Sequence, residues 1–146
     1  LCGEIVASLE GLRPEIAVSM RLDPVAEAAE RATPLALLLN EALTNALKYA
    51  ARSDGPPRID VRLAQGARGG YRLEVVNDIV DSPPERPNAI GARLMHGFAR
   101  QLRGTLTTRR AGNAFIMALH VTQADVPRPR PQIRADPAAR PRVAAQ

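Results

Sequence analysis

Apolar residues recur every three or four positions along Thr33–Ala51, and this spacing predicts an amphipathic helix. Thr33 followed by Pro34 is typical of a helix start, because the threonine oxygen can cap free N–H groups and proline lacks the N–H that would otherwise stay unpaired. We therefore expect this helix to be the centre of the fold. Its apolar face consists of Leu35, Leu38, Leu39, Ala42, Leu43, Ala46 and Leu47.

A second, polar face of the same helix carries Glu41, Asn45 and Lys48, which follow one another by four and then three residues. A carboxylate, an amide and an ammonium group are suited to hold a metal ion and phosphate oxygens. Lys48 is the single lysine among the 20 lysines and arginines of the chain, and its compact charge suits phosphate. An ordinary solvated helix has the same spacing, so both interpretations stay open.

Two elements are expected before this helix. Leu1–Leu12 places apolar residues on one helical face and starts without a cap, so we expect the sequence to begin inside a larger protein. Ile16–Leu22 alternates apolar and polar residues, which predicts a half-buried strand. Val25–Ala32 is ambiguous.

Two strands are expected after the helix. Ile59–Leu63 and Tyr71–Val75 both alternate, and a glycine-rich turn separates them, which predicts an antiparallel pair. Asn77–Ile90 carries three prolines and three acidic residues and is predicted to be a loop.

The last elements complete a sheet with helices on one face. Ala92–Leu102 has a helical apolar stripe, and Thr105–Arg110 with Ala114–Val121 predicts a closing hairpin around Gly112. The order of elements predicts an α+β fold, a two-layer α/β sandwich with a mixed, mainly antiparallel sheet. We expect one domain over residues 1–122 and a disordered Pro/Arg-rich tail over residues 123–146.

The net charge of +5 does not indicate a nucleic-acid-binding protein. Five arginines and two aspartates follow Ala124, so most of the excess charge belongs to the tail. Two Tyr, two Phe and no Trp leave few side chains on which bases could stack. Cys2 is the only cysteine, which excludes an internal disulfide and favours a reducing, cytoplasmic location. No apolar run of about twenty residues predicts a transmembrane segment.

Two stretches resemble one known family. LLLNEALTNALKYA, ending at Ala50, resembles the N-box of the catalytic, ATP-binding domain of sensor histidine kinases, in the GHKL superfamily with its Bergerat fold. GARLMHGFARQLRGTL, starting at Gly91, is similar to the second glycine box and the helix after it. The resemblance is closest to kinase subfamilies common in alphaproteobacteria and covers residues 1–122.

The resemblance implies ATP and Mg²⁺ as cofactors and transfer of the γ-phosphoryl group of ATP to a histidine. It implies Asn45 as a Mg²⁺ ligand, with Glu41 as the catalytic residue that polarises a water and helps to hold the metal shell. Lys48 would contact phosphate oxygens, and Tyr49 would line the nucleotide pocket. The second glycine box would add nucleotide contacts from Gly91, Arg93 and Leu94.

The sequence departs from the family at the first glycine box, where the pattern is Asp-x-Gly-x-Gly. Asn77 stands at the position of the aspartate that accepts a hydrogen bond from adenine, and Ile79 and Asp81 stand at the two glycines. An asparagine carbonyl still accepts that bond, at a cost of about 1–2 kcal/mol. Alternatively, a shift of one residue brings Asp78 to the nucleotide. In the second box, Ala89 and Ala92 replace family residues.

The partners implied are a histidine-containing dimerisation domain and a response regulator. His96 and His120 are expected to be structural, so the phosphoacceptor would lie outside this sequence. Two alternatives stay open. In one, the domain is a degenerate relative that no longer binds ATP and docks response regulators. In the other, it resembles the anti-sigma-factor serine kinases that share the fold.

Overall fold

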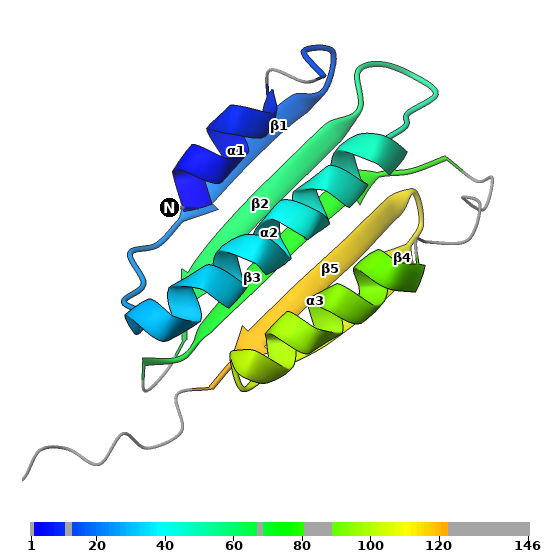
Figure 1. Ribbon diagram of the computed structural model, residues 1–146. Helices are drawn as coiled ribbons and strands as arrows, with labels where there is room; N and C mark the ends of the chain where they lie inside the picture. The colour runs from blue at the N-terminus through cyan, green and yellow to red at the C-terminus, as the bar shows by residue number, and fades with distance from the viewer. Residues whose placement is uncertain (1, 11–12, 67–68, 81–88, 123–146) are drawn as a thin grey trace, which may run out of the picture.

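The computed structural model describes residues 2–10, 13–66, 69–80 and 89–122 (Figure 1). Helices and strands follow one another in the order expected from the sequence. Their bounds are α1 Cys2–Glu10, β1 Ala17–Leu22, α2 Ala29–Tyr49, β2 Arg58–Gln65, β3 Tyr71–Asp78, α3 Ala89–Gln101, β4 Gly104–Ala111 and β5 Ala114–Val121.

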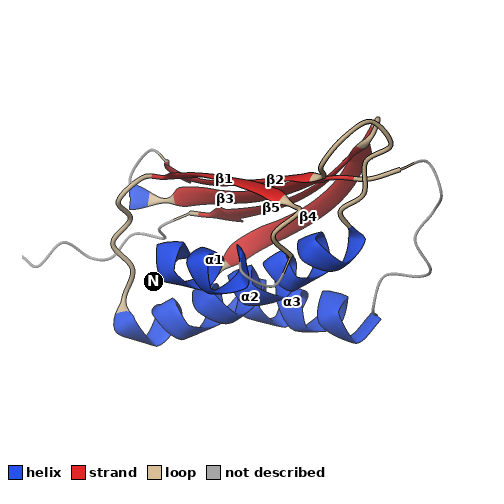
Figure 2. Cartoon of the chain, turned by 90° about the horizontal axis from the view of Figure 1, so that it is seen from above, coloured by secondary structure: helices blue, strands red, loops and turns tan. Residues whose placement is uncertain are grey.

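The chain forms two layers, with the sheet on one side and α1, α2 and α3 on the other (Figure 2). The strand order is β1-β2-β3-β5-β4. β1 runs parallel to β2, whereas the β2–β3, β3–β5 and β4–β5 pairs are antiparallel. The predicted α/β sandwich, with a mixed, mainly antiparallel sheet and helices on one face, is confirmed.

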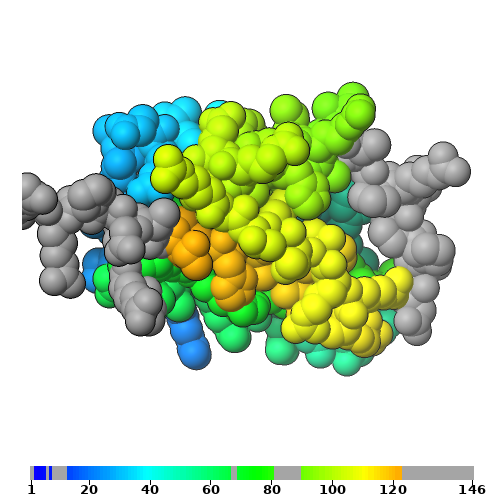
Figure 3. Space-filling model, turned by 90° about the horizontal axis from the view of Figure 1, so that it is seen from below, coloured from blue at the N-terminus to red at the C-terminus, as the bar shows by residue number. Residues whose placement is uncertain are grey.

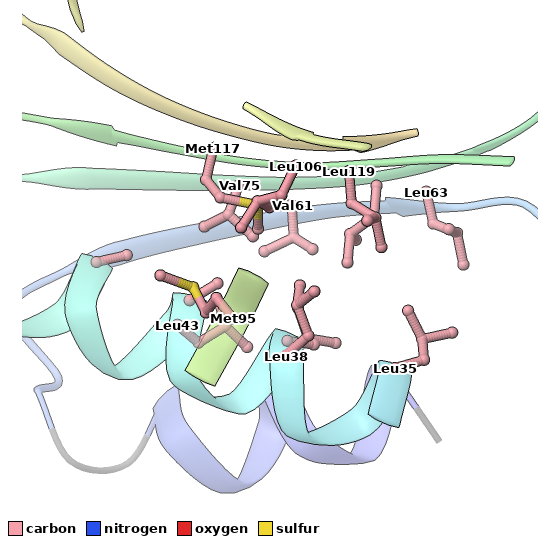
Figure 4. Packing of buried hydrophobic residues seen from close by; sticks show 14 of the residues in the cluster. Leu35, Leu38, Leu43, Val61, Leu63, Val75, Met95, Leu106, Met117 and Leu119 are labelled. Carbon is pink, nitrogen blue, oxygen red and sulfur yellow. The ribbon is translucent and has the colours of Figure 1, made fainter. Parts of the chain in front are cut away.

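The core lies between α2 and the inner face of the sheet (Figure 4). On β3 every second residue is buried, because alternate side chains of a strand point to the same face. Apolar residues of α2 pack onto this face, as the helical spacing predicted, and Met95 of α3 and Leu102 just after it add to the core. The side chains that are almost fully buried are Leu38, Leu39, Ile59, Val61, Leu73, Val75, Leu102 and Leu119.

The predicted start of the central helix is wrong by one turn. α2 begins at Ala29 and ends at Tyr49, so Thr33 and Pro34 lie inside it. The added turn is closed by N–H groups of Arg31 and Ala32, which both donate to the Ala28 carbonyl. Arg31 also forms an ion pair with Glu27, at 2.7 Å. This stretch consists of good helix formers, and Pro34 removes only one hydrogen bond near the start of the helix.

The predicted loop Asn77–Ile90 is shorter at both ends. β3 continues through Asp78 and α3 begins at Ala89, while residues 81–88 lie outside the described residues. The closing hairpin is confirmed, and Gly112 at its turn has φ of 56°, a value that favours glycine. The tail over residues 123–146, predicted to be disordered, also lies outside the described residues.

The edge of the sheet departs from the predicted half-buried strand. Ile16 is buried just before β1, but Met20, on β1 itself, is 41% exposed. β1 is an edge strand with a neighbouring strand on one side only, so fewer side chains surround Met20 than surround residues of the central strands. Cys2 is partly buried against the core, and burial raises the pKa of its thiol. None of the helices in the described part is long and apolar enough to cross a membrane.

Candidate functional site

A cavity of about 420 Å³ lies between α2, α3 and the inner faces of β3, β4 and β5. This size is typical of small-molecule sites, which are mostly apolar with a few polar groups. α3 packs against both α2 and β4 and so closes one side, and Figure 3 shows it lying along the last hairpin. The lining residues are Ala42, Asn45, Ala46, Tyr49, Val75, Asn77, Ile79, Ala92, Met95, Thr108, Arg110, Phe115 and Met117.

Asn77 is buried although its side chain is polar, with 4% of its surface exposed. Its Nδ2 donates a hydrogen bond of 3.1 Å to the backbone carbonyl of Asp78. Because a carbonyl only accepts, this bond fixes which end of the amide faces it. The other end, Oδ1, has no hydrogen-bond partner within the described residues and can accept a bond from a ligand.

Asp78, the alternative to Asn77, does not line the cavity. Alternation along β3 turns its side chain away from the helices. Its carboxylate accepts a hydrogen bond of 3.1 Å from the backbone N–H of Arg58 and lies 3.7 Å from the Arg52 guanidinium. The geometry therefore brings Asn77, and not its neighbour, to the cavity.

Asn45 and Glu41 lie one turn apart on α2 and contact each other. The amide Nδ2 of Asn45 donates a long hydrogen bond of 3.4 Å to Glu41 Oε1. Asn45 lines the cavity, and Glu41 is half-buried beside it. Since Nδ2 faces Glu41, the amide oxygen of Asn45 is turned away from that carboxylate.

Lys48 and Tyr49 sit in the last turn of α2, where only Tyr49 lines the cavity. Lys48 is exposed, and its Nζ lies 5.1 Å from the centre of the Tyr49 ring. An ammonium group at that distance from an aromatic face is weakly attracted to it. Lys48, which was predicted to contact phosphate oxygens, thus lies at the rim of the cavity beside Tyr49.

The three residues predicted from the second glycine box are on α3 but outside the cavity lining. Gly91 is buried, whereas Arg93 and Leu94 are exposed. The residues of α3 that line the cavity are Ala92 and Met95, three positions apart. On a helix, that spacing selects one face, and Arg93 and Leu94 are rotated away from it.

Four lining residues on the last hairpin were not predicted from the sequence. Thr108 and Arg110 come from β4, and Phe115 and Met117 come from β5. Phe115 is paired with Asn77 across the sheet, so it flanks the buried amide. The sequence predicted only a hairpin here, because no local pattern distinguishes side chains that border a cavity from side chains that fill a core.

A second hollow, of about 480 Å³, lies at the end of β3 beside the cavity. Arg52 donates to Asp54 there, over 2.6 Å, and holds the pKa of that carboxyl below its usual value. The other lining residues are Ala51, Ser53, Asp78, Ile79, Val80 and Asn113. Ile79 lines both spaces.

Several solved structures with a similar fold are histidine kinases. The histidine kinase domain of the blue-light activated kinase EL346 of Erythrobacter litoralis matches 82% of this chain, with a TM-score of 0.73 and 24% identity. The mycobacterial sensor histidine kinase MprB matches 82%, with a TM-score of 0.67 and 16% identity. The catalytic domain of histidine kinase ThkA matches 82%, with a TM-score of 0.66 and 14% identity. The chain has the fold of a histidine kinase catalytic domain.

The extent of the match differs among these kinases. The chain covers 62% of the EL346 kinase-domain structure and 39% of a longer structure of the same kinase. It covers 91% of the MprB structure. No family model matches this sequence, and no curated protein does. The likeness to histidine kinase catalytic domains is therefore one of fold.

A histidine kinase needs a phosphoacceptor histidine, and the two histidines of this chain lie away from the cavity. His96 is exposed on α3. His120 is exposed on β5, where its Nε2 lies 2.8 Å from a guanidinium nitrogen of Arg72. His120 thus contacts Arg72 on the outer face of the sheet, and a structural role for either histidine stays a prediction.

Proposed function

We propose that this chain is the ATP-binding catalytic domain of a two-component sensor histidine kinase. It would transfer the γ-phosphoryl group of ATP to a histidine of a dimerisation domain outside this sequence. A response regulator would then receive the phosphoryl group in the cytoplasm. Three supports are the kinase fold, the cavity inside it and the polar groups gathered on the cavity wall.

The observation that carries the proposal is the free acceptor of Asn77 in that cavity. Its Nδ2 is bound to the Asp78 carbonyl, so Oδ1 is the end available to a ligand. Oδ1 would accept a hydrogen bond from the exocyclic amino group of adenine. Apolar neighbours such as Val75, Met95 and Met117 would enclose the base.

The Mg²⁺ ion implied by this function fits the residues of α2. Mg²⁺ keeps several waters and takes one or two protein ligands beside the phosphates. The Asn45 amide oxygen would be the direct ligand, because the bond from Nδ2 to Glu41 turns that oxygen away from the carboxylate. Glu41 would orient the amide and hold a water. The ion would neutralise charge on the phosphates when bound.

The remaining residues position the reacting groups. Phosphoryl transfer needs alignment and charge stabilisation more than covalent help. The bond between the γ-phosphorus and its bridging oxygen breaks, ADP leaves, and a bond to the histidine nitrogen forms. Lys48 at the rim would contact phosphate oxygens, and its contact with Tyr49 would restrict the positions that the ammonium can take.

One observation favours a second candidate, a degenerate domain that docks response regulators without ATP. The first glycine of the family's box is replaced by Ile79, whose side chain is 92% buried in the wall of the cavity. An isoleucine there takes space that a glycine leaves to the ligand. The two candidates differ in whether the cavity admits a nucleotide at all.

Calorimetric titration of the chain with ADP, with and without Mg²⁺, separates them. The kinase proposal expects micromolar to sub-millimolar affinity that depends on Mg²⁺, and the same for a non-hydrolysable ATP analogue. Heat that is absent at millimolar ADP, together with an unchanged melting temperature, would support the degenerate candidate. Titration with GDP is the matched control, because a 6-oxo group offers Asn77 Oδ1 no donor.

A further inference from the structure

The cavity and the strand-end hollow meet at one side chain. Within the described part of the chain, Ile79 is the one residue that lines both spaces. On the cavity side its neighbours are mainly apolar, and on the other side they include Arg52, Asp54 and Asp78. The Ile79 side chain therefore stands between an apolar chamber and a polar one.

The backbone that carries Ile79 is held from the neighbouring hairpin. The N–H of Ile79 donates to the Asn113 carbonyl over 2.9 Å, just beyond the last β3–β5 pair, Asp78 with Ala114. Arg110 donates to the carbonyl of the next residue, Val80, also over 2.9 Å. Two bonds tie this segment to one hairpin, so displacing the wall would cost hydrogen bonds.

Ile79 also stands next to the group that would hold the base. Asn77 and Ile79 are two residues apart and both face the cavity, which places their Cα atoms about 7 Å apart in extended chain. An adenine amino group bound to Asn77 Oδ1 therefore has the Ile79 side chain beyond it. Any substituent on that amino group would meet this wall.

We propose that Ile79 is a specificity-determining residue that limits the cavity to an unsubstituted adenine, by separating it from the strand-end hollow. The inference rests on the proposed function for its ligand. Truncation of Ile79 joins the two spaces, and the hollow then accepts a substituent carried on the amino group. The chemical class gained is the N6-substituted adenine nucleotides.

The test compares the affinities of ADP and N6-benzyl-ADP by calorimetry in the wild type, Ile79→Ala and Val80→Ala. Val80 is the matched control, because it is the next β-branched residue and is 38% exposed. It lines the hollow but not the cavity. The wild type and Val80→Ala should prefer ADP. Ile79→Ala should shift the ratio of affinities about ten- to a hundredfold toward N6-benzyl-ADP, because a few carbon atoms in the wall of a pocket change discrimination between ligands by about this factor.

An unchanged ratio in folded Ile79→Ala overturns the proposal, and so does an equal shift in Val80→Ala. Ile79→Val removes a single methylene group and should give a smaller shift in the same direction, even where the alanine variant folds poorly. A wild type that binds neither nucleotide contradicts the proposed function. In that case a crystal structure of Ile79→Val or Ile79→Ala tests whether Ile79 separates the cavity from the hollow. If the two spaces stay separate in the variant, the proposal is overturned.

Discussion

Asn77 and Asp78 are neighbours on β3, but their side chains serve different spaces: Asn77 lines the cavity under the helices, and Asp78 lines the strand-end hollow. The Asp78 backbone carbonyl joins the two, because it accepts hydrogen bonds from Asn77 Nδ2 and from the Ala51 N–H. A shift of one residue along β3 thus separates Asn77, which faces the cavity, from Asp78, which holds neighbouring backbone groups.

Replacement by alanine should mainly weaken ADP binding at Asn77 and mainly lower stability at Asp78. Asn77→Ala removes the acceptor for adenine and should weaken ADP binding about tenfold, the value of one hydrogen bond of about 1.4 kcal/mol. The Asp78 carbonyl keeps its bond from Ala51, so the fold should persist. Calorimetry with ADP is the measurement.

Asp78→Ala is the matched variant. It should leave ADP affinity within about twofold and lower the melting temperature, since the Arg58 N–H loses its acceptor. The opposite outcome, lost binding in Asp78→Ala and unchanged binding in Asn77→Ala, would assign the nucleotide contact to Asp78.

Asn45→Ala should abolish the dependence of nucleotide binding on Mg²⁺ and leave the melting temperature nearly unchanged. Its amide contributes one long hydrogen bond, to Glu41, so little stability is lost with it. Calorimetric titrations of ADP with and without Mg²⁺ measure the effect.

Asn40→Ala is the control, because Asn40 is an exposed asparagine on the same helix. It should bind as the wild type does. A loss of Mg²⁺ dependence in both variants, or unfolding of Asn45→Ala, would remove Asn45 from the proposed metal site.

Tyr71 should make the fold sensitive to alkaline pH. Its side chain is 97% buried, and its hydroxyl has no hydrogen-bond partner in the described part of the chain. Burial, and then the nearby Glu27 carboxylate, raise the pKa of Tyr71 well above its ordinary value. A folded-state pKa above the unfolded value gives stability that is present below about pH 10 and lost as the pH rises further.

Tyr71→Phe should flatten this alkaline loss, measured as urea midpoints between about pH 8 and pH 11. At neutral pH the variant should be as stable as the wild type or slightly more stable, because an unpaired buried hydroxyl is removed. An equally steep loss in the variant would show that other groups cause it.

Two glycines should respond in opposite ways to alanine. Gly97 lies inside α3, where an added Cβ meets nothing within 4 Å, so Gly97→Ala should stabilise the fold by about 0.5–1 kcal/mol. At Gly104 the Cβ would lie 2.8 Å from the His120 carbonyl oxygen and 2.9 Å from Leu119 Cδ1. Gly104→Ala should therefore destabilise by about 1–3 kcal/mol. Thermal melts that rank the two variants in reverse would contradict this account of their packing.

Much of the fold could be predicted because buried residues recur at every second position on a strand and at every third or fourth position on a helix. Alternation on β2 and β3 and the three-four spacing on α2 placed the core residues correctly. The start of α2 was missed because Thr33 and Pro34 form a strong local start signal, which the helix-forming stretch before them overrides. Met20 was misplaced because sequence alternation does not tell an edge strand from a central one.

The cavity was predicted only in part. Of the residues named from the sequence, Asn45, Tyr49 and Asn77 line the cavity, because a residue's position along a helix or strand specifies the face on which it lies. Their roles toward a ligand stay predictions. Thr108 and Arg110 were missed because their role depends on how far α3 lies from β4, a distance that no local pattern encodes.

The most direct test of the account is an amide NMR titration of the ¹⁵N-labelled chain with ADP and Mg²⁺. We expect the largest shifts at the backbone amides of Asn45 and Tyr49 and at the side-chain amide of Asn77, with small shifts at Ser53 in the hollow. Shifts that centre on Ser53, or no shift at millimolar ADP, would contradict nucleotide binding in the cavity.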